Sequence, residues 1–102
     1  MEKYLTQKEL RQALDGVPTM RDLTSALCTV PYRQRSGRRA WPLAEVIPAL
    51  KRYYETKVIE NEVRHLVRQP REGETQIFLT YATVYRERLN RLNELMERRA
   101  TT

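Results

Sequence analysis

The 102-residue sequence has little cysteine, histidine or glycine, and each scarcity excludes a class of protein. The single cysteine, Cys28, rules out an internal disulfide, and its apolar flanks predict a small buried hydrophobic residue. One histidine, His65, cannot form a metal-binding or nucleophile–base grouping with one distant cysteine. The three glycines form no Gly-rich phosphate loop. We therefore expect no catalytic residues, no bound metal, no cofactor and no enzyme activity.

Long apolar runs are also missing. No stretch approaches the roughly 20 apolar residues that are needed to span a bilayer. The first residues, Met1 to Leu5, lack the apolar stretch of a signal peptide. We accordingly expect a cytoplasmic protein without a membrane partner. The charged fraction of 31% suits a small folded protein that exposes much of its surface.

Acidic residues are absent from one internal segment. No Asp or Glu occurs between Asp22 and Glu45, although four arginines fall there. Residues 1–54 carry ten Lys or Arg against five Asp or Glu, a balance of +5, whereas residues 55–102 carry nine against eight, a balance of +1. A basic cluster without neighbouring acids is typical of proteins that bind a polyanion. The plainer alternative is a solvated loop.

Two short helices are predicted before this segment. Residues 6–9 have the sequence of a capping box, and the apolar spacing that follows predicts a helix over roughly 7–15, ending at Gly16. Thr19 predicts the cap of a second helix, with Asp22 in the box position. The apolar face expected for this second helix consists of Met20, Leu23, Ala26 and Leu27. Two short helices joined by a glycine-containing turn outline a helix-turn-helix.

The basic segment itself predicts a β-hairpin. Ser36 and Gly37 form a turn sequence between two short extended runs. We expect Tyr32 and Trp41 to face inward as core residues, with the arginines facing out; the alternative is that the two rings stack on bases. A third helix follows, beginning at Leu43 or the next residue.

A helical tail is predicted from about residue 55. A first stripe of apolar residues continues to Gln69, a break covers residues 70–74, and a last helix covers roughly 76–99. A heptad seam within the last helix is formed by Phe78, Ala82, Tyr85, Leu89, Leu92 and Met96. This seam predicts either a coiled coil between two chains or an intramolecular helical hairpin with residues 55–69. A two-chain four-helix bundle would satisfy both.

The order of these elements resembles a winged helix-turn-helix. The motifs Pro31-Tyr32-Arg33, Ser36-Gly37-Arg38-Arg39 and Trp41-Pro42-Leu43 are similar to the wing and the following helix of the MerR-like superfamily. Residues 5–10 likewise resemble its opening helix, so the resemblance covers about residues 4–54. The superfamily includes MerR-type regulators, phage excisionases and the small terminase subunits of lambda-type phages. This chain departs from the superfamily in the second helix. In most members that helix is richer in polar or basic residues, whereas here Arg21 is its only cation.

We therefore predict a mainly α protein with two parts. Residues 1–54 are predicted to form a winged helix-turn-helix DNA-binding domain with a small β-hairpin wing, and residues 55–102 a coiled-coil or helical-hairpin dimerisation tail. The predicted DNA-binding residues are Thr19, Arg21, Thr24 and Ser25 in the second helix, and Arg33, Arg35, Ser36, Gly37, Arg38 and Arg39 in the wing. For Thr19 a role restricted to helix capping is the open alternative.

The resemblance implies a function in a bacterial or phage system. The expected partner is double-stranded DNA, bound by a homodimer that acts as a transcriptional regulator or as an architectural factor of the excisionase or small-terminase kind. A larger protein partner, such as a recombinase, terminase or polymerase, fits the architectural role. One alternative is a protein-interaction module whose arginines meet an acidic partner. Another is RNA binding, for which stacking aromatics on an exposed sheet are expected.

Overall fold

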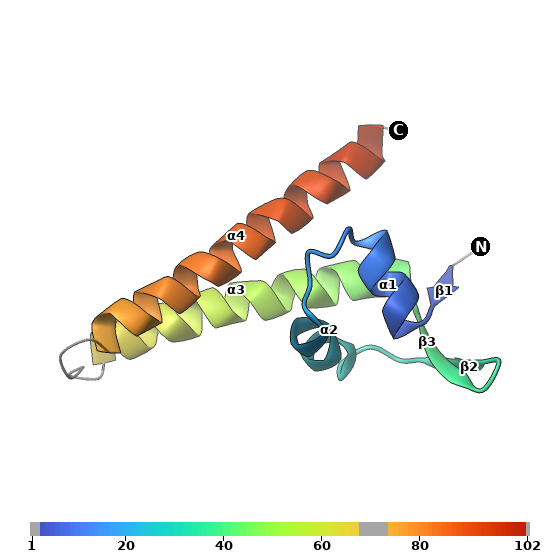
Figure 1. The fold of residues 1–102 in the computed structure, drawn as a ribbon, viewed down its shortest axis with the longest axis horizontal. Helices are drawn as coiled ribbons and strands as arrows, with labels where there is room; N and C mark the ends of the chain where they lie inside the picture. Colours follow the sequence, from blue (N-terminus) through green and yellow to red (C-terminus); the bar gives the residue numbers. More distant parts are fainter. Residues whose placement is uncertain (1–2, 68–73, 102) are drawn as a thin grey trace. The chain divides into compact units, whose positions relative to one another are not determined.

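The computed structural model describes the backbone of residues 3–67 and 74–101, and the side chains of residues 3–63 and 79–99. Within this part the chain is mainly helical, with four helices and one three-stranded antiparallel sheet. The elements follow the order β1 (Tyr4–Leu5), α1 (Gln7–Ala13), α2 (Met20–Leu27), β2 (Arg33–Arg35), β3 (Arg38–Pro42), α3 (Leu43–Val67) and α4 (Glu74–Thr101) (Figure 1). The chain divides into two compact units, Met1–Tyr53 and Tyr54–Thr102, so that α3 contributes to both. None of the described helices is long and apolar enough to cross a membrane.

Both short helices begin with the predicted capping boxes. At α1 the Thr6 hydroxyl accepts from the amide of Glu9, and the Glu9 carboxylate accepts from the amide of Thr6. At α2 the hydroxyl of Thr19 accepts from the amide of Asp22 at 3.1 Å, and the Asp22 carboxylate accepts from the Thr19 amide at 3.3 Å. Gly16, just past α1, has the positive φ of +71° that its position predicts.

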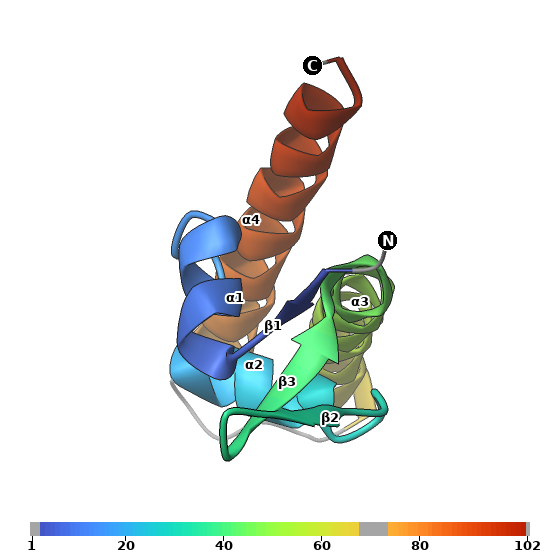
Figure 2. The ribbon, with the colours of Figure 1, turned by 90° about the vertical axis from the view of Figure 1, so that its right-hand side faces the viewer.

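The predicted β-hairpin is present, with its tip at Ser36 and Gly37. Both tip residues have positive φ, +51° and +77°, as a type I′ turn requires. Sequence reasoning missed β1, which is only two residues long and therefore shows no alternation. It pairs with β3, placing Leu5 opposite Trp41, and β3 lies between β1 and the outer strand β2 (Figure 2).

The core of the first unit is formed by one face of each helix and by β3. Its fully buried side chains include Leu10 of α1, Leu14 at the C-cap of α1, and Leu23 of α2. One prediction for α2 was wrong: Met20, expected on the apolar face, is 45% exposed at the first position of the helix. Asp22, in the predicted box position, is buried, and its carboxylate completes the cap.

In the second unit, the C-terminal part of α3 contacts α4. The ring of Tyr54 is buried and lies 6.3 Å from that of Tyr85, and Glu62 forms an ion pair with Arg86. Of the six seam residues, Ala82 and Leu92 are buried, Tyr85, Leu89 and Met96 are partly exposed, and Phe78 lies outside the described side chains. Residues 70–73 of the predicted break lie outside the described part of the chain. Glu74, also predicted in the break, is instead the first residue of α4.

Candidate nucleic-acid interface

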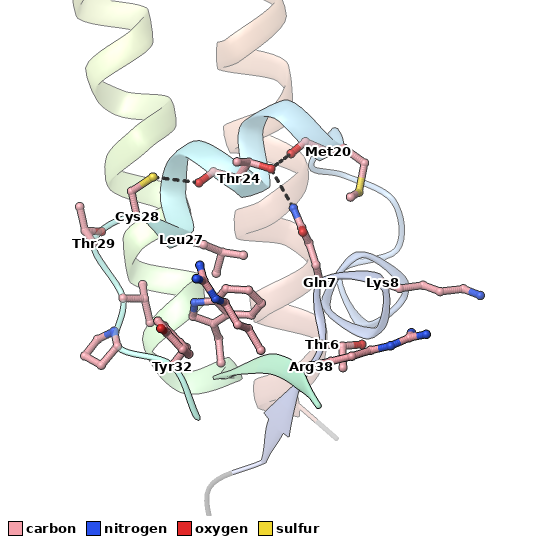
Figure 3. Close-up of a pocket in the computed structure, with 14 residues that line it drawn as sticks. Thr6, Gln7, Lys8, Met20, Thr24, Leu27, Cys28, Thr29, Tyr32 and Arg38 are labelled. Carbon is pink, nitrogen blue, oxygen red and sulfur yellow. Dashed lines mark hydrogen bonds between the residues drawn. The ribbon is translucent and has the colours of Figure 1, made fainter. Parts of the chain in front are cut away.

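A groove of about 870 Å³ lies between α2 and the hairpin in the first unit (Figure 3). It is lined by Thr6, Gln7 and Lys8 at the start of α1, by Met20, Thr24 and Leu27 of α2, by Cys28 to Tyr32 after that helix, and by Arg38, Arg39 and Trp41 of the hairpin. Three of these residues are cations, and among the described lining residues none is an acid. The groove therefore presents positive charge to any ligand that enters it.

Two of the four predicted wing arginines lie outside this groove and have partners within the chain. The guanidinium carbon of Arg33 lies 4.7 Å from the centroid of the Tyr4 ring. Arg35 donates to the Glu9 carboxylate at 2.8 Å and to the backbone carbonyl of Tyr4 at 3.3 Å. These contacts join the outer strand β2 to β1 and to the start of α1, so these two arginines hold the hairpin in place.

The other two arginines line the groove. The guanidinium carbon of Arg39 lies 4.6 Å from the centroid of the Tyr32 ring, and this ring in turn lies 6.2 Å from that of Trp41. The side chain of Arg38 forms no hydrogen bond or ion pair with any residue in the described part of the chain. Figure 3 shows the side chains of Arg38 and Lys8 extending to the same side of the site. Lys8, which the sequence analysis did not single out, thus accompanies Arg38.

The arginines next to the hairpin tip also face one another. Arg35 and Arg38 are directly opposite in the β2–β3 register, where like charges repel. Glu9 offsets one of the two charges, because its carboxylate accepts from Arg35. Hydrogen bonds from the Thr6 backbone and hydroxyl, followed by Arg35, lower the pKa of Glu9 below its ordinary value of 4.5. Glu9 is ionised at neutral pH, so of these two arginines only Arg35 has an ion-pair partner among the described residues.

The four predicted contact residues of the second helix differ in whether their side chains already form hydrogen bonds within the chain. The Thr19 hydroxyl caps the helix. The Thr24 hydroxyl donates to the carbonyl of Met20 at 2.7 Å and accepts from the Gln7 amide at 2.8 Å (Figure 3). Its donor is therefore used within the chain. Arg21 and Ser25 are exposed on the same helix, but neither lines the groove.

The structure corrects the predictions for Cys28 and Tyr32. Cys28 is exposed, because it lies four residues after Thr24 and so continues the polar face of α2. Its thiol donates to the carbonyl of Thr24 at 3.3 Å. Tyr32, expected to face inward, is 47% exposed, whereas Trp41 is buried as predicted. Tyr32 precedes β2, and its ring contacts that of Trp41 and the guanidinium of Arg39.

The described residues contain no cluster of three or more His, Cys, Asp or Glu side chains with the geometry to hold a metal ion. What the first unit does offer is a positively charged groove beside the polar face of a short helix. Comparison of the chain with protein-family models, with curated proteins and with solved structures finds no match.

Proposed function

We propose that the first unit is a winged helix-turn-helix of the MerR-like type and that the protein binds double-stranded DNA through α2 and the hairpin. In this proposal it serves as a transcriptional regulator or as an architectural factor of a bacterial or phage nucleoprotein complex. The observation that carries the proposal is the groove beside α2, which contains three cations and no acid among its described lining residues.

The chemistry of the two sides of the groove suits a duplex. The major groove of DNA admits an α-helix, and α2 has exposed side chains at Arg21 and Ser25, next to its groove-lining residues but not among them. A guanidinium at the tip of a hairpin suits a phosphate or the negative potential of a narrow minor groove. Arg38 fits that role best, because its guanidinium forms no hydrogen bond or ion pair in the described part of the chain.

Binding to a random-sequence duplex, measured by fluorescence anisotropy over a range of salt concentrations, tests this proposal. Arg38→Ala is expected to weaken binding to all sequences and to reduce the salt slope by about one unit. The matched control is Arg52→Ala, which removes the same charge from an exposed position of α3 outside the groove. No affinity of the wild-type protein for duplex DNA at moderate salt, or equal losses for the two variants, would refute the proposal.

We also propose that the second unit joins two chains. Ile59 and Val63 of α3 and Leu79 and Tyr81 of α4 are between 45% and 60% exposed, although all four side chains are large and apolar. Exposed apolar groups on a helical pair favour a four-helix arrangement of two chains. Two DNA-binding units on neighbouring half-sites would then act as one bivalent ligand.

Sedimentation equilibrium tests the dimer directly. The wild-type protein is expected to have the mass of two chains at micromolar concentration, and Ile59→Glu to shift it towards one chain. Asn90→Glu adds the same charge at an exposed position of α4, at least nine residues from Leu79 and Tyr81, and is expected to leave the mass unchanged. A wild-type protein that sediments as a single chain throughout would refute this part of the proposal.

A further inference from the structure

Each face of the hairpin carries an arginine over a tyrosine ring, but only one of these pairs lines the groove. The guanidinium carbons of Arg33 and Arg39 lie 4.7 Å and 4.6 Å from the ring centroids of Tyr4 and Tyr32. Arg39 and Tyr32 both line the groove, whereas Arg33 and Tyr4 do not. The chain therefore contains a matched pair of stacked guanidinium groups, one inside the groove and one outside.

The stack in the groove is fixed to the core. Trp41 is 8% exposed and is held in β3 opposite Leu5. The Tyr32 ring lies 6.2 Å from that of Trp41 and is tilted by 55° to it, and Arg39 covers Tyr32. A guanidinium stacked on an aromatic face keeps its N–H groups at the edge of the plane, where they can donate to phosphate oxygens. Stacking also restricts an otherwise flexible side chain before binding, so less conformational entropy is lost in the complex.

We propose that Tyr32 is a positioning residue for DNA binding: its ring, held by Trp41, orients the guanidinium of Arg39 to contact a phosphate in the groove. This inference rests on the proposed DNA binding and adds to it a role for an aromatic residue. It also accounts for the exposure of Tyr32, because a ring placed wholly in the core would not be accessible to Arg39.

A double-mutant cycle measured by DNA-binding anisotropy tests this role. Tyr32→Leu is expected to weaken binding about two- to fivefold, and Tyr32→Phe, which keeps the ring, to bind like the wild type. In an Arg39→Ala background Tyr32→Leu is expected to have no further effect, because the group that it positions is missing. An equal loss in both backgrounds, or no loss in either, would overturn the inference while leaving DNA binding itself established.

Conservative replacement of the arginines gives a second test that leaves the aromatic residues intact. Arg39→Lys keeps the charge but loses the planar stacked group, and we expect the same two- to fivefold loss. Arg33→Lys, at the matched stack outside the groove, is expected to cause none. Circular dichroism shows whether each variant is folded. If Tyr32→Leu is unfolded, the inference is tested by the comparison of the two lysine variants alone. Equal affinities for these variants would overturn the inference, and a wild-type protein without affinity for duplex DNA would refute it together with the proposed function.

Discussion

The cap of α2 provides a test of whether Thr19 supports the helix or contacts a ligand. Thr19→Ala removes the hydroxyl that accepts from the amide of Asp22 at 3.1 Å. It leaves that amide without its partner at the start of an eight-residue helix that has few other hydrogen bonds to stabilise it. We expect a loss of about 1 kcal/mol in the free energy of unfolding. In thermal unfolding followed by circular dichroism, this is a decrease of about 4–8 °C in Tm for a chain of this size.

Two further variants separate capping from DNA contact. Thr19→Ser keeps the accepting hydroxyl and is expected to unfold within a few degrees of the wild type. Ser25→Ala, at an exposed position of the same helix, is expected to leave Tm unchanged and to weaken DNA binding instead. If Thr19→Ala weakens DNA binding without lowering Tm, the capping role assigned here is wrong and Thr19 is a contact residue.

Three more perturbations test the hairpin and the groove. The folded-state pKa of Glu9 lies below 4.5, so its contribution to stability is complete above that pH and is lost as the pH falls through the folded value. The free energy of urea unfolding should therefore decrease less below pH 4.5 in Glu9→Gln than in the wild type. An equal decrease in the two proteins would contradict this. Gly37→Ala forces an alanine to φ +77° at a tip with no neighbouring atom within 4 Å, and should cost about 1 kcal/mol in urea unfolding through backbone strain alone; a fully stable variant would show that the turn relaxes. Cys28 is exposed in the groove, so the native protein should react with a thiol reagent and saturating duplex DNA should slow that reaction; equal rates with and without DNA would argue against occupation of the groove.

Local sequence signals predicted most of the secondary structure. Both capping boxes depend on residues three positions apart, and the tip of the hairpin depends on two adjacent residues. Such features are determined by backbone hydrogen bonding and by φ, and they need no knowledge of the rest of the fold. The last helix was predicted over roughly 76–99 from apolar periodicity and is present as Glu74–Thr101.

Local sequence patterns could not predict contacts between segments that are distant in the sequence. β1 has two residues and is recognisable only through its partner β3. The place of Lys8 in the groove depends on how α1 meets the hairpin, and the exposure of Cys28 depends on which face of α2 is covered. The apolar neighbours of Cys28 in the sequence predicted a buried side chain, but Cys28 is exposed. Residues adjacent in sequence lie on different faces of a helix, so their character does not determine its burial.

The four arginines of the hairpin illustrate why a basic sequence overstates the charge available to a ligand. The sequence treats them as one cluster, yet Arg35 pairs with Glu9 and Arg33 stacks on Tyr4 outside the groove. An arginine that must leave an internal partner to meet a phosphate contributes only the difference between the two interactions. Arg38 has no such partner in the described part of the chain, and a stacked Arg39 keeps its N–H edge open. The salt dependence of DNA binding should therefore follow the cations of the groove rather than the arginine count of the hairpin.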